Sequence, residues 1–450
     1  MLFTRDKNFY KTLLHLMLIV VFQNLVAYSI NMADNLMLGM YSQAALSGVA
    51  TVNQIQFLLQ QMTLAIGDTL VIIGSQYWGA KNTKPIRNLT GIALIVGLIL
   101  GVAVLVCTTF FPREILMLFT KKESFITEGV TYLSLIRFTY PLFVLSTILL
   151  AALRSVETVS IALKISILSF FVDVSINYTL IFGKFGFSEM GTKGAAIGTL
   201  VARILELLMA ILYLIFVDSK LRLFCKDLFH FTKESVRHFF KILWPSFVSN
   251  TLWALATPIQ TGILGRLSSD AIAANSVSTT MFQYLKVITI GEASASSVLI
   301  GTCIGENRGI QKVKEYSKTL QVIYLIIGSV LGICLFFLRI PLLSMYDLTP
   351  HAYELADQIL IILSIVMVGM SYQMPTGIGI IKGGGDVKYM MYLNLISTWV
   401  IVMPLSFLGA FVWKLSVPVV VLLLNSDQLF KCIPTYLYVK KNQWIKKLTS

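Results

Sequence analysis

Residues 91–111 read GIALIVGLILGVAVLVCTTFF and contain no charged side chain. A helix of about 20 apolar residues is long enough to cross the hydrocarbon core of a bilayer. Comparable apolar stretches recur along the chain, for example at 320–338 and 359–374. Of the 450 residues, 56% are hydrophobic and 13% are charged, about half the charged share of an average soluble domain. The sequence therefore predicts an all-α integral membrane protein.

Charged segments and segments that contain Gly or Pro divide the chain into about twelve predicted transmembrane helices. These cover residues 12–38, 51–77, 88–111, 129–152, 159–183, 193–217, 239–264, 277–304, 316–338, 354–381, 388–411 and 414–438. The longest polar stretch separates two sets of six. We therefore expect an N-terminal six-helix lobe at 1–217, a cytoplasmic linker at 218–241 and a C-terminal six-helix lobe at 242–450.

The basic residues indicate an orientation in the membrane. The loops on one side of the predicted helices hold roughly 24 Lys and Arg, against roughly 8 on the other side. Because cytoplasmic loops are enriched in basic residues, we expect both termini to be cytoplasmic, in a bacterial cell membrane. The net charge of +14 is spread over short loops, which argues against nucleic-acid binding.

The two halves resemble each other. GMYSQAALSGVA at 39–50 matches GRLSSDAIAANS at 265–276, and at the same offset Gly79 matches Gly305. Each half has an even number of helices, so the repeats are parallel and favour a central cavity between two lobes, as in secondary transporters. KGGGD at 382–386 lacks the Lys-Ser/Thr of a nucleotide-binding loop and predicts a turn, so we expect coupling to an ion and no other cofactor.

Acidic residues inside transmembrane helices are the candidate functional residues, since charges there are costly. Asp34 continues a polar stripe of the first helix with Asn31, Tyr28 and Asn24, at spacings of three and four. We expect this stripe to face away from lipid and Asp34 to lie on the path of an ion or substrate. The alternative is that Asp34 lies near the outer end of its helix and is simply solvated.

A second candidate cluster lies in the fifth and sixth predicted helices. Asp173 and Asn177 are four residues apart and converge on one helix face, and Thr199 adds a hydroxyl oxygen. Hard oxygen ligands suit Na⁺ or H⁺. The alternative is a hydrogen bond between helices that only stabilises the bundle.

Further candidates have weaker support. Asp68 and Glu292 each follow a Gly in the second and eighth predicted helices, and the alternative for Glu292 is a neutralised structural pair with Lys286, as for Arg203 with Glu206. The candidates for substrate contact or gating are Asn31, Asp68, Gln260, Glu292 and Tyr372, and the hinge candidates are Pro258 and Pro375. Five scattered cysteines (Cys107, Cys225, Cys303, Cys334 and Cys432) predict neither disulfides nor a metal site.

Several motifs resemble those of the multidrug and toxin extrusion (MATE) family, from about residue 10 to 440. They are NMADNLMLG (31–39), AALSGVA (44–50), SQYWGAKN (75–82), LIFG (180–183), GAAIGTLVAR (194–203), GRLSSDAIAAN (265–275) and IKGGGDVKY (381–389). The resemblance implies cation-coupled export of small, often cationic amphipathic compounds. It places the coupling acid at Asp34 and a cation site at Asp173, Asn177 and Thr199.

The sequence departs from the family's pattern in two places. The fifth-helix pair runs Asp then Asn, where many sodium-coupled members have Asn then Asp. The seventh predicted helix, SFVSNTLWALATPIQ at 246–260, lacks the acid that other members carry there. Coupling through the second lobe then depends on whether Glu292 substitutes for that acid.

Two other functions stay open. A flippase for a lipid-linked oligosaccharide has the same architecture but needs a more cationic cavity, and a membrane-embedded transferase needs clustered acids or a His–acid pair. The four histidines of the chain form no such pair in the sequence. We expect a monomeric transporter, not an enzyme, whose partners are a small-molecule substrate and the lipid bilayer.

Overall fold

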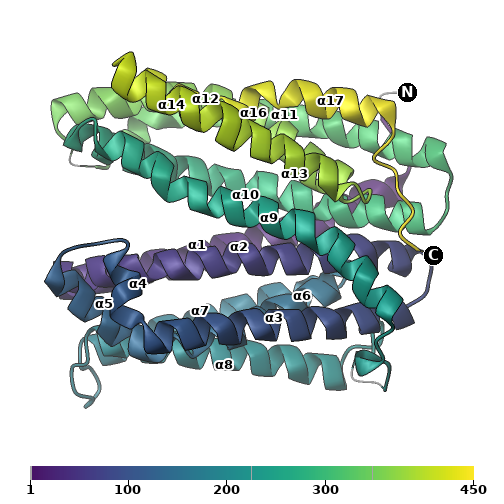
Figure 1. Ribbon diagram of the computed structural model, residues 1–450, viewed down its shortest axis with the longest axis horizontal. Helices are drawn as coiled ribbons and strands as arrows, with labels where there is room; N and C mark the ends of the chain where they lie inside the picture. The colour runs from purple at the N-terminus through teal and green to yellow at the C-terminus, as the bar shows by residue number, and fades with distance from the viewer. Residues whose placement is uncertain (1–2, 224–225, 347, 450) are drawn as a thin grey trace. The chain divides into compact units, whose positions relative to one another are not determined.

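A computed structural model describes residues 3–223, 226–346 and 348–449, and these residues form helices and no strand (Figure 1). The first eight α-helices are α1 (Lys7–Tyr41), α2 (Gln43–Gly79), α3 (Lys84–Phe110), α4 (Pro112–Met117), α5 (Glu123–Ile136), α6 (Thr139–Ser155), α7 (Ser160–Ile181) and α8 (Thr192–Phe216). After the short 3₁₀ helix η1 (Lys226–Phe229) come α9 (Lys233–Gly265), α10 (Ser269–Gly305), α11 (Ile310–Leu343) and α12 (Pro350–Pro375). The π-helical η2 (Thr376–Lys382) leads into α13 (Val387–Leu395), η3 (Ile396–Val402), α14 (Met403–Phe407), η4 (Leu408–Val412), α15 (Val417–Leu424), α16 (Asp427–Phe430) and α17 (Cys432–Lys441).

The helices are long and apolar enough to span a bilayer. Among the described residues ten helices or continuous helix series meet that criterion, and α5 with α6 makes an eleventh if this pair, bent by 55°, is one span. α9 has a comparable length of 33 residues but lies outside that group and contains Pro245 and Pro258. Each of the twelve predicted transmembrane helices overlaps one of these helices or series, and the all-α membrane fold is confirmed.

The fourth predicted helix, at 129–152, corresponds to α5 and α6, which are bent by 55° at a break that the prediction did not include. Pro141 has no N–H to donate to the carbonyl of Arg137, which instead accepts from the N–H of Tyr140 at 3.2 Å. The chain bends at this point.

α2 and α10 begin about two turns before the starts predicted at 51 and 277. Ser42 caps α2 by accepting a hydrogen bond from the N–H of Ala45 (3.0 Å), and Ser268 caps α10 in the same way through Ala271 (3.0 Å). A serine at this position satisfies an N–H that the helix itself leaves unpaired. Both bounds of α10 lie 226 positions after those of α2, so the internal repeat is present at the level of helices.

The chain divides into two compact units. One comprises residues 1–21, 75–81 and 244–450, and the other comprises 22–74 and 82–243. We call the first of these the C-unit and the second the N-unit. The two six-helix lobes at 1–217 and 242–450, the cytoplasmic linker at 218–241 and the central cavity stay predictions.

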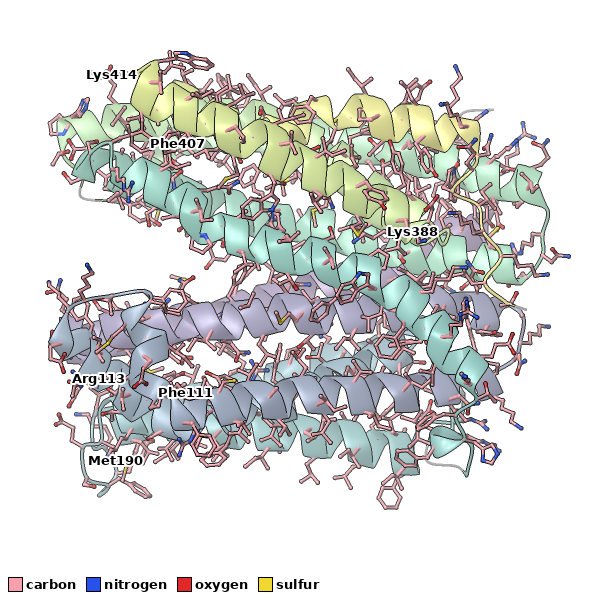
Figure 2. All side chains as sticks on the ribbon, viewed as in Figure 1. Phe111, Arg113, Met190, Lys388, Phe407 and Lys414 are labelled. Atoms are coloured by element: carbon pink, nitrogen blue, oxygen red, sulfur yellow. The ribbon has the colours of Figure 1, made fainter. Side chains whose placement is uncertain are left out.

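Within each unit the helices pack through apolar side chains. The C-unit core joins α10, α11, α12 and α15, with Leu335, Ile359 and Val420 fully buried in it. In the N-unit, α7 packs along α8 and α3 along α6. Large apolar side chains also lie on the outer faces, as Phe407 on α14 does with an exposed fraction of 51% (Figure 2). Such faces fit a lipid surrounding.

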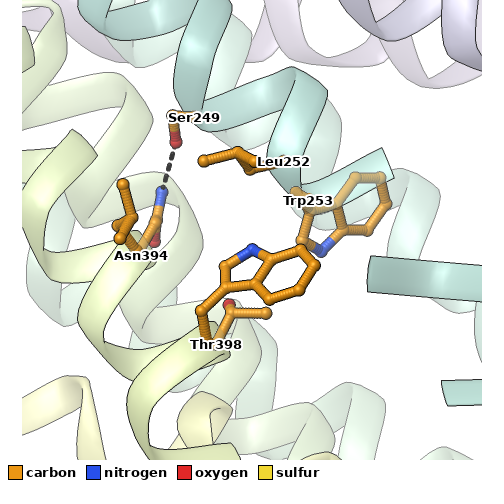
Figure 3. A pocket seen from close by; sticks show the side chains of 7 residues that line it. Ser249, Leu252, Trp253, Asn394 and Thr398 are labelled. Atoms are coloured by element: carbon orange, nitrogen blue, oxygen red, sulfur yellow. Dashed lines mark hydrogen bonds between the residues drawn. The ribbon is translucent and has the colours of Figure 1, made fainter. Parts of the chain in front are cut away.

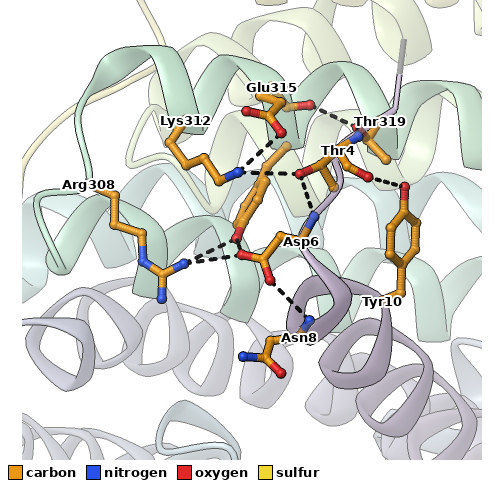
Figure 4. Close-up of polar contacts among 9 residues, drawn as sticks. Thr4, Asp6, Asn8, Tyr10, Arg308, Lys312, Glu315 and Thr319 are labelled. Atoms are coloured by element: carbon orange, nitrogen blue, oxygen red, sulfur yellow. Dashed lines mark hydrogen bonds and ion pairs between the residues drawn. The ribbon is translucent and has the colours of Figure 1, made fainter. Parts of the chain in front are cut away.

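The start of the chain is fixed to α11 by polar contacts (Figure 4). Thr4 N–H donates to Thr319 Oγ1 at 2.9 Å, and the Tyr316 hydroxyl donates to Asp6 Oδ2 at 2.6 Å. Arg308, which also pairs with Glu306, lies 3.5 Å from the same carboxylate. The hydrogen bond from Tyr316 lowers the pKa of Asp6 and keeps this acid ionised at neutral pH.

The predicted turn at 382–386 is confirmed, and the end of the chain packs against it. Asp386 caps α13, and Gly385 adopts a φ of +101° that a glycine tolerates. Trp444 is fully buried on Gly384, where an added Cβ would lie 2.2 Å from its ring. Gln76, at the end of α2, bonds to Lys446 O (3.1 Å) and Leu448 N (2.7 Å). Within the C-unit, the C-terminal segment therefore links residues 75–79, the end of α2, to the turn before α13.

The four cysteines in the described part of the chain, Cys107, Cys303, Cys334 and Cys432, are free thiols. Cys225 lies outside the described residues.

Replacing Trp444 by Ala should destabilise the protein by about 3–5 kcal/mol, because it empties a fully buried indole site. Thermal unfolding of the detergent-purified protein measures this as a lower Tm. Trp413→Ala is the matched control, since that indole is 53% exposed. Equal Tm values for the two variants would contradict the packing described for the C-terminal segment.

Candidate functional site

One amide joins two carboxylates inside the N-unit. Asn177 on α7 donates from Nδ2 to Asp34 Oδ1 on α1 at 2.8 Å and to Asp173 Oδ2 at 3.1 Å. Asp173 is 1% exposed and Asn177 is fully buried, whereas Asp34 is half-buried. The four-residue spacing of Asp173 and Asn177 puts both on one face of α7, and the fold brings α1 to that face. We call Asp34, Asp173, Asn177 and Thr199 the acidic site.

Three oxygens of the acidic site are buried and have no hydrogen-bond partner. They are Asp173 Oδ1, Asn177 Oδ1 and Thr199 Oγ1. Thr199 lies beside Asp173 and the buried Tyr132. Buried polar oxygens are nearly always paired, so three unpaired oxygens beside two carboxylates are a ready set of ligands for a proton or a small hard cation.

One cation of the protein faces this site. The positive charge of Arg203 on α8 lies near enough to attract the carboxylates of both Asp34 and Asp173. Its guanidinium is held by Glu206 at 2.6 Å and lies over the Phe143 ring at 5.0 Å. Since Glu206 neutralises Arg203, the negative charge of the two carboxylates of the acidic site is left uncompensated.

Gly198 on α8 makes room for the bridging amide. A Cβ at this position would lie 1.9 Å from Asn177 Oδ1 and 3.2 Å from the backbone N of Asn177. No side chain fits there, so glycine is what allows α7 and α8 to approach and the amide to reach Asp34. The sequence shows this glycine in GAAIGTLVAR but contains no sign of the contact it permits.

Of the two possible structural pairs, Arg203 and Glu206 lie 2.6 Å apart, whereas Lys286 and Glu292 do not pair. The Lys286 ammonium lies 5.4 Å from the centre of the Trp253 ring, and Asp427 is the acid that acts on it. Six residues turn an α-helix by about 600°, which puts Lys286 and Glu292 on different faces of α10. Glu292 is 1% exposed and neither of its carboxylate oxygens has a hydrogen-bond partner.

The other candidates lie apart from the acidic site. Asp68 on α2 is 3.4 Å from Arg154 on α6, and Tyr372 on α12 donates to Gln321 Oε1 at 2.8 Å. Asn31 is exposed on α1, and Gln260 is half-buried on α9. Their roles in substrate contact or gating stay predictions.

The two hinge candidates differ in setting. Pro258 is exposed inside α9, whereas Pro375 is buried at the point where α12 passes into the π-helical η2. A proline in a helix removes a backbone hydrogen bond, and a π-helical segment marks an altered bonding pattern. Pro375 is therefore the better supported of the two hinge predictions.

A small pocket lies in the C-unit between α9 and the α13–η3 segment (Figure 3). Its lining includes Trp253, Trp399 and Thr398, and Asn394 donates to Ser249 Oγ across it at 3.2 Å. The enclosed space of about 10 Å³ has room for about one water molecule. It is too small for an organic substrate as it stands. Among the described residues, no group of three His, Cys, Asp or Glu side chains is placed to hold a metal ion.

Comparison with known proteins gives a consistent result. A family model described as MatE matches residues 20–179 and 245–408. A Thermotoga maritima protein named as a probable multidrug resistance protein NorM is 23% identical over 441 residues, which cover 97% of this chain and 93% of that protein.

Two solved structures share the fold. An outward-facing multidrug resistance MATE family transporter of the MOP superfamily has a TM-score of 0.87 at 16% identity, covering 98% of both chains. A MOP superfamily transporter from Pyrococcus furiosus, for which a reverse polarity of the binding pocket suggests a different function, has a TM-score of 0.87 at 17% identity, covering 98% of this chain and 96% of its own.

Gly198→Ala should lower the stability of the protein by about 1–3 kcal/mol, because the new methyl group overlaps Asn177 Oδ1 and overpacks the α7–α8 contact. Thermal unfolding in detergent measures the loss. Gly262→Ala is the control: this helical glycine has no atom within 4 Å of an added Cβ, so its replacement is neutral or slightly stabilising. If both variants unfold at the same temperature, the close approach at Gly198 is wrong.

Proposed function

The chain belongs to the MatE family, whose members are membrane transporters and not enzymes, and from this premise we propose that it exports small cationic amphipathic compounds in exchange for a monovalent cation. The resemblance drawn from the sequence motifs is thereby confirmed at the level of the family. Coupling ion, substrate class, monomeric state and the orientation of the termini are parts of the proposal.

The observation that carries the proposal is the bridge from Asn177 to Asp34 and Asp173, with three unpaired oxygens beside it. Two close carboxylates cannot both stay ionised in a buried site without a positive charge between or beside them. A proton or Na⁺ supplies that charge. Its binding and release then change the contacts of α1, on which Asp34 lies, with α7.

Exchange follows from competition for the same negative charge. A cationic substrate that approaches the carboxylates when they are free is disfavoured once a cation has neutralised them. Each cation therefore lowers the affinity for the other, by the same factor in both directions. The family relative named as a multidrug resistance protein supports a substrate class of this kind.

The first test is transport by the purified protein in proteoliposomes loaded with a fluorescent lipophilic cation. Sodium and proton gradients are imposed separately, and the effective gradient identifies the coupling ion. Asp34→Asn should lower the rate of gradient-driven export by about ten- to a hundredfold, since it removes a charged contact worth about 1.5–3 kcal/mol. Glu189→Gln, at an exposed loop acid, serves as the control and should export like the native chain.

Two results would contradict the proposal. Export by the Asp34→Asn variant at the native rate would remove the acidic site from the mechanism. A native protein that moves no lipophilic cation under either gradient would overturn drug export and leave lipid-linked substrates to be examined.

The proposed orientation is tested by reporters fused to the C-terminus. The basic residues near Lys440, Lys441 and Lys446 predict that this end is cytoplasmic. A fluorescent protein fused there should fold and fluoresce, and a periplasmic phosphatase fused at the same position should be inactive. The opposite pair of results would reverse the orientation.

A further inference from the structure

Glu292 is a buried acid that the acidic site does not use. It lies on α10 in the C-unit, 1% exposed, and both of its carboxylate oxygens lack a hydrogen-bond partner. An ionised carboxylate without a partner costs several kcal/mol in such a place. The other two buried acids of the described part of this unit are neutralised: Asp427 by Lys431 at 2.8 Å and Asp386 by Lys446 at 2.8 Å.

The elements packed around Glu292 offer it no positive charge. On the α1 side, Met17 and Val21 contact the neighbouring Gly291. On α11, the titratable group that faces Glu292 is Tyr324, a phenol. In the described part of the chain, the Glu292 carboxylate forms no ion pair with a Lys, Arg or His, and neither of its oxygens accepts a hydrogen bond. A proton is therefore needed to neutralise it.

The neighbouring hydroxyl groups also favour a proton over a metal cation. Tyr324 on α11 is hydrogen-bonded to Ser296 on α10, and Thr289 on α10 is hydrogen-bonded to Ser371 on α12 at 3.0 Å. Na⁺ needs several oxygen ligands at once, as hard cations do, and these oxygens already serve one another. A proton needs only the carboxylate itself.

We propose that Glu292 is a second cation-binding site of the transporter, which takes up a proton in this state and releases it during the transport cycle. This inference rests on the proposed function and extends it, because each cycle then moves a proton in the C-unit in addition to the cation bound at Asp34. It also supplies the C-unit with a coupling group although its α9 carries no acid between 246 and 260.

Proton release on substrate binding tests the proposal. The purified native protein in weakly buffered detergent solution is mixed with tetraphenylphosphonium, and a pH-sensitive dye counts the protons released. Glu292→Gln should release about one proton fewer per protein than the native chain, whichever ion occupies Asp34. Glu354→Gln, at an exposed acid of α12, should match the native chain. Equal release by Glu292→Gln and the native protein overturns the proposal.

An infrared measurement keeps this test separate from the test of drug export. The native protein without substrate should show the C=O band of a protonated carboxyl that Glu292→Gln lacks and Glu354→Gln retains. This band should be lost reversibly when the pH is raised. A band that is absent, or that never titrates, overturns the inference even if export is confirmed. If the glutamine variant does not fold, Glu292→Asp tests the assignment by shifting the band.

Discussion

The need to neutralise two carboxylates inside a membrane protein governs the N-unit. Asp34 and Asp173 come from different helices, and the amide of Asn177 reaches both. A neutral amide can align two acids but cannot compensate their charge. Around this bridge the structure is arranged for close approach: Gly198 removes a side chain, and Glu206 with Phe143 fixes Arg203. This arrangement is the basis for our proposal that the site binds an additional cation.

The C-unit meets a similar problem in a different way. Most of its acids are paired with Lys or Arg, which makes them structural. Glu292 differs from them and is the acid that we propose to bind a proton, because it is buried among apolar contacts and hydroxyl groups that bond to each other. The two halves of the chain repeat their helices at a constant offset, yet their charged groups differ. Shared architecture therefore does not require that both halves bind a cation by the same residues.

The sequence predicted the features that depend on local spacing. Hydropathy located every long helix, and the four-residue spacing of Asp173 and Asn177 placed them on one helix face. The sequence could not predict contacts between helices. The need for glycine at position 198, for example, depends on how closely α7 approaches α8. The break before Pro141 and the caps at Ser42 and Ser268 could have been predicted, since a missing N–H and an N-cap serine are local signals. Lys286 and Glu292 do not pair, because side chains six residues apart point in different directions on an α-helix.

The most direct test of the central claim is an equilibrium binding measurement on the purified native protein. Binding of tetraphenylphosphonium is titrated at a series of fixed sodium and proton concentrations. If cation and substrate compete for the charge of Asp34 and Asp173, the substrate Kd rises in proportion to one of these ions, and Asp34→Asn removes that dependence. A substrate Kd that does not change with either ion would contradict the account.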